Sequence, residues 1–195
     1  LMPPFMGQGM CAGIRDASNL AWKIVKCLKQ RHSEKILDSY QSERFPNAKE
    51  YIETTMRMGE FVNAIESTQI TDNISSNQDG TKSMQSIKPK LGPGLGKNKD
   101  NNRGVIFPQL KMKTGGAFDE KFSKNLLLIV TPELKIKSKL SKYPTIIANE
   151  VGGLSNLLKS YNSKAIIIRP DRFIFQSCNS VKNFGKFLKK LNNFN

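Results

Sequence analysis

The sequence predicts a mixed α/β protein in which a helical first part is followed by a part built from short strands and helices. Up to residue 66, apolar residues recur at helical spacing, whereas from residue 104 they gather in short β-rich runs. The stretch between them is rich in Ser, Asn, Gly, Pro and Lys. We therefore divide the chain into a helical part at 1–66, a linker at 67–103 and an α/β domain at 104–195.

The helical part opens with a loop rich in proline and glycine that leads into an amphipathic helix. The loop reads Pro3-Pro4-Phe5-Met6-Gly7-Gln8-Gly9-Met10-Cys11-Ala12-Gly13. In the helix that follows, one face is apolar and the lysines point away from it. The apolar positions are Ala17, Leu20, Ala21, Ile24 and Leu28, and the lysines are Lys23, Lys26 and Lys29. A second helix should begin near Ser33, and Pro46 should interrupt it and start a third that reaches Ile65.

The second part of the chain is expected to alternate strands with helices. Pro170-Asp171 is a hairpin signal between two β-rich runs, and the chain closes with an amphipathic helix carrying Val181, Phe184 and Leu188. The expected strands span 108–112, 125–131, 144–149, 164–169 and 172–177, with a helix at 151–161.

The formal net charge of +15 raises the possibility of a nucleic-acid partner. The lysines are spread along the chain, however, and no cluster of arginines interleaved with aromatic residues occurs. We therefore expect no nucleic-acid binding, and a non-catalytic basic interaction module remains an alternative.

The cysteines and the apolar runs indicate the cellular environment of the protein. Cys11, Cys27 and Cys178 are odd in number and show no Cys-x-x-Cys spacing, which argues against a disulfide, a metal site or a dithiol centre. The longest apolar runs are too short to span a bilayer, and no signal segment follows residue 1. We expect a cytoplasmic protein without a membrane segment.

The opening loop is the best candidate for a binding site. A helix N-terminus offers unpaired N–H groups and partial positive charge to an electron-rich ligand. Gly7 and Gly9 would let the main chain approach a planar ring where a Cβ atom would collide. The simpler interpretation is a turn that starts a helix. A second glycine-rich stretch, Gly92 to Gly96, follows no strand and is expected to be a turn into the second domain rather than a phosphate loop.

The opening loop resembles the second flavin-contacting motif of the FAD-dependent aromatic-ring hydroxylases. These are monooxygenases of the para-hydroxybenzoate hydroxylase type, and the likeness is greatest to the hydroxyphenylpropionate hydroxylases. The stretch Tyr40–Pro46 is similar to the family string Tyr-x-x-Glu-Arg-x-Pro. The stretches 104–109 and 168–172 resemble the thioredoxin-like C-terminal domain of phenol and hydroxyphenylpropionate hydroxylases. The implied fold is the helical C-terminal part of the FAD-binding domain followed by a thioredoxin-like domain without a redox-active Cys pair.

This resemblance implies an enzyme that hydroxylates a phenolic or other aromatic ring with NAD(P)H and O2, through a flavin hydroperoxide. FAD would be the cofactor, NAD(P)H the reductant, and no side chain of this chain would be catalytic or bind a metal. Self-association of the chain is left open. The implied flavin contacts are Pro4, Gly7, Gln8, Gly9, Met10 and Cys11.

The same resemblance indicates whether this chain contains the whole FAD site. In the family, Gly-Asp-Ala-Ala-His precedes the motif, and its Asp holds the ribityl chain of FAD. This sequence starts after that string, so the resemblance implies a fragment that is inactive by itself. Another alternative is an inactive truncated product. Cys11 also departs from the benzoate hydroxylases, which have Asn there, and we expect it to act through its backbone.

Overall fold

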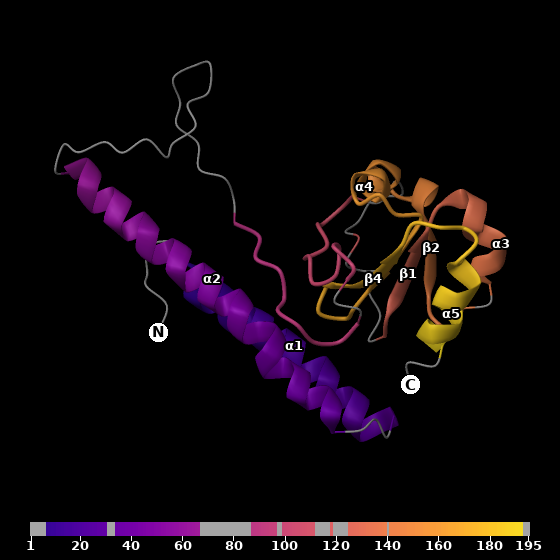
Figure 1. The fold of residues 1–195 in the computed structure, drawn as a ribbon, viewed down its shortest axis with the longest axis horizontal. Coiled ribbons are helices and arrows are strands. Elements are labelled where there is room, and N and C mark those ends of the chain that lie inside the picture. Colours follow the sequence, from indigo (N-terminus) through magenta and orange to yellow (C-terminus); the bar gives the residue numbers. More distant parts are fainter. Residues whose placement is uncertain are drawn as a thin grey trace, which may run out of the picture.

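The computed structural model describes residues 7–30, 34–66, 87–96, 99–111, 118, 125–139 and 141–192. Two long helices lie side by side, and a connecting segment leads from them to a small sheet with helices on both faces (Figure 1). We call α1 (Gln8–Gln30) and α2 (Lys35–Glu66) the helical pair, and residues 125–192 the C-terminal unit. This agrees with the predicted α/β class.

The second predicted helix does not break at Pro46, so that expectation was wrong. Pro46 lies inside the continuous helix α2. A proline has no N–H, so the carbonyl of Ser42 loses its donor within the helix. The neighbouring carbonyl, that of Glu43, accepts a hydrogen bond from the N–H of Gly92 at 2.8 Å. The connecting segment thus packs on α2 just where the proline disturbs the helix.

Helix α1 buries the side opposite to the one that its pattern suggests. Lys23 and Lys26 are buried, with 0% and 3% of their surface exposed, whereas Leu28 is 78% exposed. Met10 and Ile14 are likewise exposed. The prediction that the lysines face away from the packed side was therefore wrong for these two. Their partners lie on α2 and in the C-terminal unit, which a helical pattern alone does not reveal.

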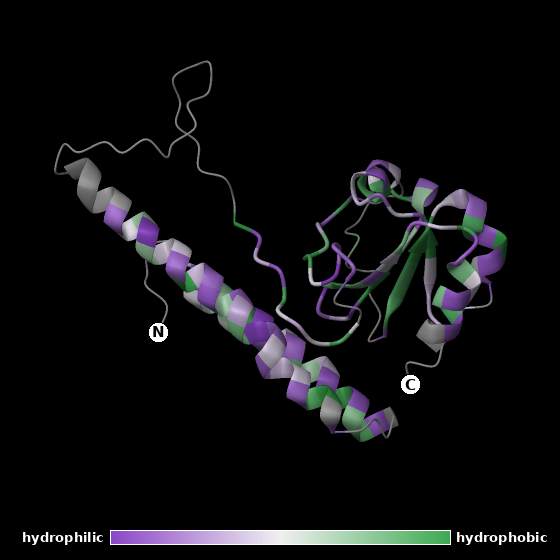
Figure 2. Ribbon diagram, viewed as in Figure 1, coloured by the Kyte–Doolittle hydropathy of each residue, from purple (hydrophilic) through white to green (hydrophobic). Residues whose placement is uncertain are grey.

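The C-terminal unit is built on a four-stranded mixed sheet with the order β2-β1-β3-β4. Strands β1 and β2 are parallel, and the other two pairs are antiparallel. The central strands are among the most hydrophobic parts of the molecule (Figure 2). The strands are β1 (Leu127–Val130), β2 (Thr145–Ile147), β3 (Ala165–Ile168) and β4 (Ile174–Cys178).

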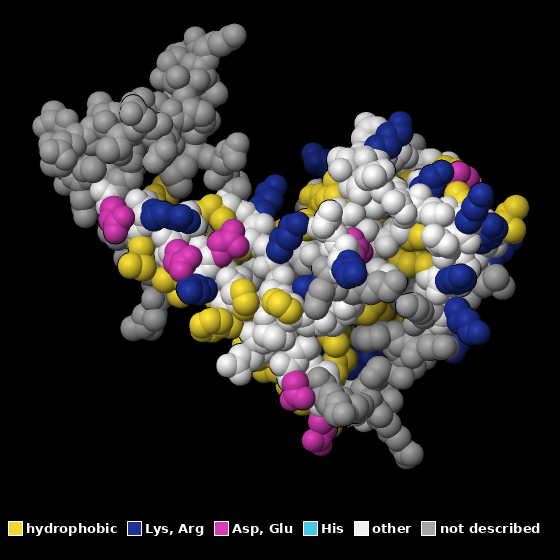
Figure 3. All heavy atoms as spheres, viewed as in Figure 1, with side chains coloured by type: hydrophobic (Ala, Val, Ile, Leu, Met, Phe, Trp, Pro, Cys, Tyr) yellow, Lys and Arg dark blue, Asp and Glu magenta, His cyan; other side chains and the backbone are white. Residues whose placement is uncertain are grey.

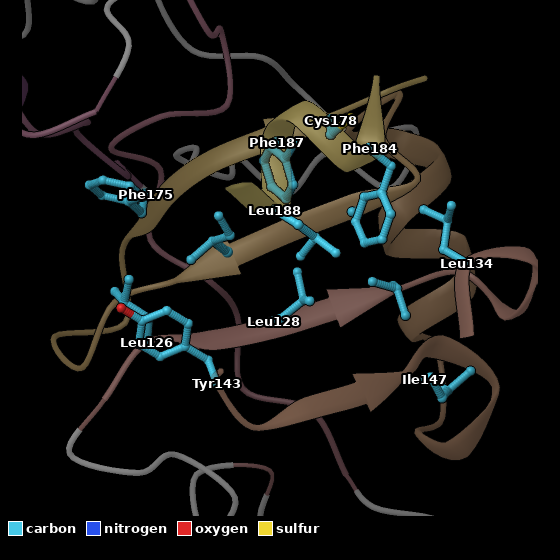
Figure 4. Packing of buried hydrophobic residues seen from close by; sticks show 13 residues of the cluster. Leu126, Leu128, Leu134, Tyr143, Ile147, Phe175, Cys178, Phe184, Phe187 and Leu188 are labelled. Carbon is cyan, nitrogen blue, oxygen red and sulfur yellow. The ribbon is translucent and has the colours of Figure 1, made fainter. Parts of the chain in front are cut away.

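Helices cover both faces of this sheet, and each face has its own apolar core. On one face, Leu128 and Ile167 pack with Leu134 and with Phe184 and Leu188 of α5 (Phe184–Asn192) (Figure 4). On the other face, the strands pack against α4 (Leu154–Ser160) together with Phe107 and Phe118. The short elements η3 (Pro132–Leu134), α3 (Lys135–Ser138) and η4 (Ala148–Glu150) join strands to helices.

Four of the five predicted strands are confirmed; three lie within their predicted limits, and β4 starts later than predicted and ends one residue further on, at Cys178. The hairpin at Pro170-Asp171 is confirmed too, because the N–H of Arg172 donates to the carbonyl of Arg169 at 2.9 Å to close a turn between β3 and β4. The strand expected at 108–112 was wrong over residues 108–110, which form no regular element, and residue 112 lies outside the described residues. Phe107 turns inward there as part of the core.

The connecting segment packs closely against α2 through its glycines. A Cβ atom on Gly92 would lie 2.3 Å from the carbonyl oxygen of Ser42, and one on Gly94 would lie 2.3 Å from the side chain of Glu43. The N–H of Leu95 also donates to Oε1 of Glu43 at 2.8 Å. These glycines are needed for close approach between backbone and helix, a role that the sequence did not indicate.

Candidate functional site

The predicted flavin contacts lie in the first turn of α1. Gly7 precedes the helix with a φ of +60°, and Gln8, Gly9, Met10 and Cys11 are its first four residues. These are the four positions whose N–H groups have no acceptor within an α-helix. Pro4 lies outside the described residues.

This first turn is open and carries no negative side chain. No acidic residue occurs in it, so its partial positive charge is not offset locally. Met10 is 75% exposed, and no atom of the described residues lies within 4 Å of a Cβ built on Gly7 or Gly9. A planar ring could therefore approach the backbone here, and the residues present fit an electron-rich cofactor.

The turns that follow are fixed to α2. The guanidinium of Arg15 donates to Oε1 of Gln8 at 3.2 Å and stacks over the Tyr51 ring, 4.6 Å from its centre. At the next residue of α1, Asp16 accepts a hydrogen bond from Nε of Arg44 at 2.6 Å. The start of α1 is thus anchored on its inner side by arginines.

A second polar assembly, the charge cluster, lies deeper along α1. We define it as Asn19, Trp22, Lys23, Glu43, Arg169 and Asp171. All four charged side chains are buried, with at most 1% of their surface exposed. Lys23 donates to Glu43 at 3.0 Å, and Arg169 donates to Glu43 at 2.8 Å and to Asp171 at 2.6 Å. The two positive and two negative charges balance.

Two uncharged donors on α1 complete the cluster. Nδ2 of Asn19 lies 2.9 Å from Asp171 and 3.2 Å from Glu43, and the indole N–H of Trp22 donates to Asp171 at 3.1 Å. The Arg169 guanidinium lies over the Trp22 ring, 5.0 Å from its centre. Every carboxylate oxygen in the cluster accepts at least one hydrogen bond, which is what buried charges require.

The charge cluster also sets the protonation of its members. Burial alone would raise the pKa of Glu43, but Arg169 and Lys23 outweigh it and hold this pKa at about 2. Burial lowers the pKa of Lys23, although Glu43 opposes that effect. Burial also opposes the charge on Arg169, but Asp171 and Glu43 raise its pKa above the ordinary value. Glu43 and Arg169 are therefore charged at neutral pH.

The structure joins the motifs that sequence analysis singled out separately. Asp16, in the helix after the opening loop, pairs with Arg44 of the 40–46 string, and Glu43 of that string pairs with Arg169 of the C-terminal unit. Sequence reasoning missed the polar roles of Asn19, Trp22, Lys23 and Glu43. The available signal was a charged residue in each string with no explained role.

The part of the chain that the structure describes contains neither a metal-ligand cluster nor a membrane-spanning helix. Within it, no three His, Cys, Asp or Glu side chains gather in a way that could hold a metal ion. None of its helices combines the length and the apolar character needed to cross a bilayer.

Comparison with known proteins supports the flavoprotein interpretation of the first helices. Residues 1–55 match the family model of the FAD binding domain. A probable NADH-specific resorcinol 4-hydroxylase of Rhodococcus jostii is 26% identical over 97% of this chain. A 3-(3-hydroxy-phenyl)propionate/3-hydroxycinnamic acid hydroxylase of Klebsiella pneumoniae is 27% identical over 89% of it. The chain spans 40% of the length of each of these relatives.

Solved structures share the fold along nearly the whole chain. The flavin-dependent monooxygenase PieE, in complex with FAD and substrate, superposes with a TM-score of 0.65 at 14% identity, over 98% of this chain and 45% of that one. RebC-10x with bound 7-carboxy-K252c gives a TM-score of 0.64 at 15% identity, over 98% and 43%. Residues 1–55 thus match the FAD binding domain family, and most of the chain is similar in sequence to aromatic hydroxylases.

Proposed function

We propose that this chain forms the C-terminal part of a flavin-dependent monooxygenase that hydroxylates a phenolic or similar aromatic ring with NAD(P)H and O2. The observation that carries the proposal is the first turn of α1. It is open and free of acidic residues, and it lies within residues 1–55, which match the FAD binding domain. Gly7, Gln8, Gly9, Met10 and Cys11 would hold the flavin ring, together with Pro4.

The role of these residues would be electrostatic. FAD, when bound, supplies the oxidising chemistry, and its reduced ring carries negative charge near N1 and O2. The N–H groups of the first turn would face that charge as fixed dipoles, which stabilise it without a mobile cation. The main chain at Gly9 would lie against the ring edge, and Cys11 would contribute its backbone.

The exposed side of α1 supports a larger flavin-binding domain around it. This side exposes five large apolar side chains, and apolar side chains are visible on the surface of the helical pair (Figure 3). A group of exposed apolar side chains often marks a surface that another part of a protein covers. Since relatives are more than twice as long as the matched region, we propose that the rest of a FAD-binding domain covers this face. The exposed apolar residues on it are Met10, Ile14, Ile24, Val25 and Leu28.

We further propose that the C-terminal unit is a thioredoxin-like domain without redox activity. A mixed sheet with order β2-β1-β3-β4, a tight β3–β4 hairpin and a closing helix supports this class. Cys178 is the only cysteine among residues 104–195, and it is buried and forms no disulfide. A dithiol reaction needs two cysteines, so a structural role is the remaining one.

The direct test uses the full gene product, with whatever residues precede Leu1. We expect a yellow protein that oxidises NAD(P)H faster when a phenol is added, with one hydroxylated product formed per NAD(P)H consumed. A colourless protein that fails to retain FAD after reconstitution would refute the proposal. The chain of 195 residues by itself should not turn over.

A substitution at Gly9 tests the contact itself. Because no neighbouring segment among the described residues lies within 4 Å of a Cβ built there, Gly9→Val should fold, and valine is no poorer a helix former than glycine. In the full gene product it should weaken FAD binding by about tenfold or more, or uncouple NAD(P)H oxidation from hydroxylation. Gly185→Val, at a glycine of α5 where an added Cβ likewise has open space, should change neither. Unchanged affinity and coupling in Gly9→Val would show that the contact is misplaced.

A further inference from the structure

The charge cluster links α1 to a turn that comes about 150 residues later in the chain. Asn19 and Trp22 donate to Asp171 across sequence separations of 152 and 149 residues. Arg169 reaches Glu43 on α2 across 126 residues. The turn between β3 and β4 therefore holds both helices of the helical pair from outside.

We propose that this turn is a clamp for α1, and that Arg169 and Asp171 are positioning residues for the first turn of that helix. The clamp would fix both the rotation of α1 about its axis and its position along that axis. Within a regular helix, Asn19 lies about 16 Å along the axis from Gln8, so a helix fixed at one end is fixed at the other.

The geometry of Asp171 favours a positioning role over simple adhesion. Its Oδ2 accepts three hydrogen bonds, from Arg169 at 2.6 Å, Asn19 at 2.9 Å and Trp22 at 3.1 Å. Hydrogen bonds are directional, and a shift of α1 by one residue would move its donors by about 1.5 Å and break them. An apolar contact between a helix and a sheet would tolerate such a shift.

Arg169 adds the second restraint. Its guanidinium binds Asp171 through two nitrogens, reaches Glu43 with a third, and stacks on the Trp22 ring. The planar fork of arginine matches this arrangement, whereas a lysine could not make these contacts at once. Buried ion pairs contribute little net stability compared with apolar packing, and a fixed geometry is the best-attested reason for one.

The first arm of the test uses the 195-residue chain alone and needs no flavin. Spin labels at Met10→Cys and Lys159→Cys, both exposed, report the distance from the start of α1 to α4, with Cys11 and Cys27 changed to Ser. We expect one narrow distance distribution in this parent protein. Arg169→Met should broaden it or add a second population.

A control variant and two alternative variants accompany this distance measurement. Lys164→Met removes an exposed ion pair to Glu133 in the same unit and should leave the distribution narrow. If Arg169→Met fails to fold, Asn19→Ala and Trp22→Phe decide, because they leave the Arg169–Asp171 pair of the C-terminal unit intact. An unchanged distribution in both of these α1 variants would overturn the clamp.

The second arm measures the consequence for the cofactor and rests on the proposed function. In the full gene product, Asn19→Ala should weaken FAD binding by about tenfold and shift the absorption spectrum of the bound flavin. Leu188→Ala, which opens a cavity in the distant core of the C-terminal unit, should lower stability without that spectral shift.

The two arms separate the two ideas. If the full gene product binds no FAD at all, the proposed function fails, while the distance measurement still decides whether the clamp exists. If Asn19→Ala loosens α1 but leaves FAD affinity and the flavin spectrum unchanged, the clamp does not position the cofactor site, and that part of the inference is overturned.

Discussion

At the scale of single residues, Glu43 has the largest number of different partners of any side chain in the charge cluster. It binds Lys23, Arg169, Asn19 and the N–H of Leu95 while fully buried. Its pKa of about 2 lies well below the ordinary 4.5, so the folded protein binds this proton more weakly than the unfolded chain does. The charged form therefore stabilises the fold above about pH 5, and this contribution is lost as the pH falls toward 2.

This pKa leads to a prediction about acid unfolding. We expect Glu43→Gln to unfold at pH 7 with a free energy lower by about 3 kcal/mol, the cost set by the pKa difference. The gap between this variant and the parent chain should close as the pH falls from about 5 toward 2. Urea unfolding at several pH values measures it, with Glu133→Gln as the exposed control. A gap that stays constant with pH would contradict the role given to the Glu43 charge.

Gly92 is a second residue whose identity the packing dictates. An added methyl group would lie 2.3 Å from the carbonyl oxygen of Ser42 and 2.6 Å from the Pro46 ring. Neither neighbour is a flexible side-chain end, so the connecting segment would have to move. We expect Gly92→Ala to lower the free energy of unfolding by about 1–3 kcal/mol. Gly185→Ala on α5, which meets no atom within 4 Å, should not, and equal effects would show that the segment adjusts freely.

At the scale of elements, sequence patterns correctly predicted the turns and strands whose formation depends on neighbouring residues. Pro170-Asp171 indicated the hairpin, and the apolar runs gave the central strands, because a turn or a buried strand depends on adjacent residues. Pro46 misled, because α2 continues past it at the place where the connecting segment, which is distant in sequence, packs on the helix through Gly92. Lys23 and Lys26 misled for the same reason: a helical pattern cannot show that an acid or an aromatic ring will meet a lysine.

The end of α4 supports a prediction of this local kind. Asn162 has a φ of +47°, and the N–H groups of Asn162 and Ser163 donate back to Lys159 and Leu158, each at 2.9 Å. This is a Schellman-type ending, in which glycine is favoured at the left-handed position. Asn162→Gly should therefore keep or raise stability, and Asn162→Ala should lower it by about 1 kcal/mol. Thermal unfolding of the two variants measures the difference, and the reverse order would mean that the Asn side chain itself holds the turn.

At the scale of the whole molecule, the candidate site could be predicted only where its residues are continuous in sequence. The opening loop and its helix were found because the motif is continuous in sequence. The charge cluster was not, because its carboxylates and their donors come from α1, α2 and the β3–β4 turn. The apolar face of α1 was predicted to be the packed one, but its large apolar side chains are exposed among the described residues.

That face gives the last prediction. Ile14 and Leu28 are 58% and 78% exposed, so replacing both with polar residues (Ile14→Gln with Leu28→Lys) should change the free energy of unfolding of the 195-residue chain by less than about 0.5 kcal/mol. The same double variant should reduce the binding of an apolar dye and the self-association of the chain, since it removes contiguous apolar surface. In the full gene product it should instead destabilise the protein, because there the face would be covered by the rest of the FAD-binding domain. Dye fluorescence, light scattering and urea unfolding separate these effects. A large loss of stability in the 195-residue chain would mean that α1 is already covered within it, and that it needs no further domain to bury its apolar face.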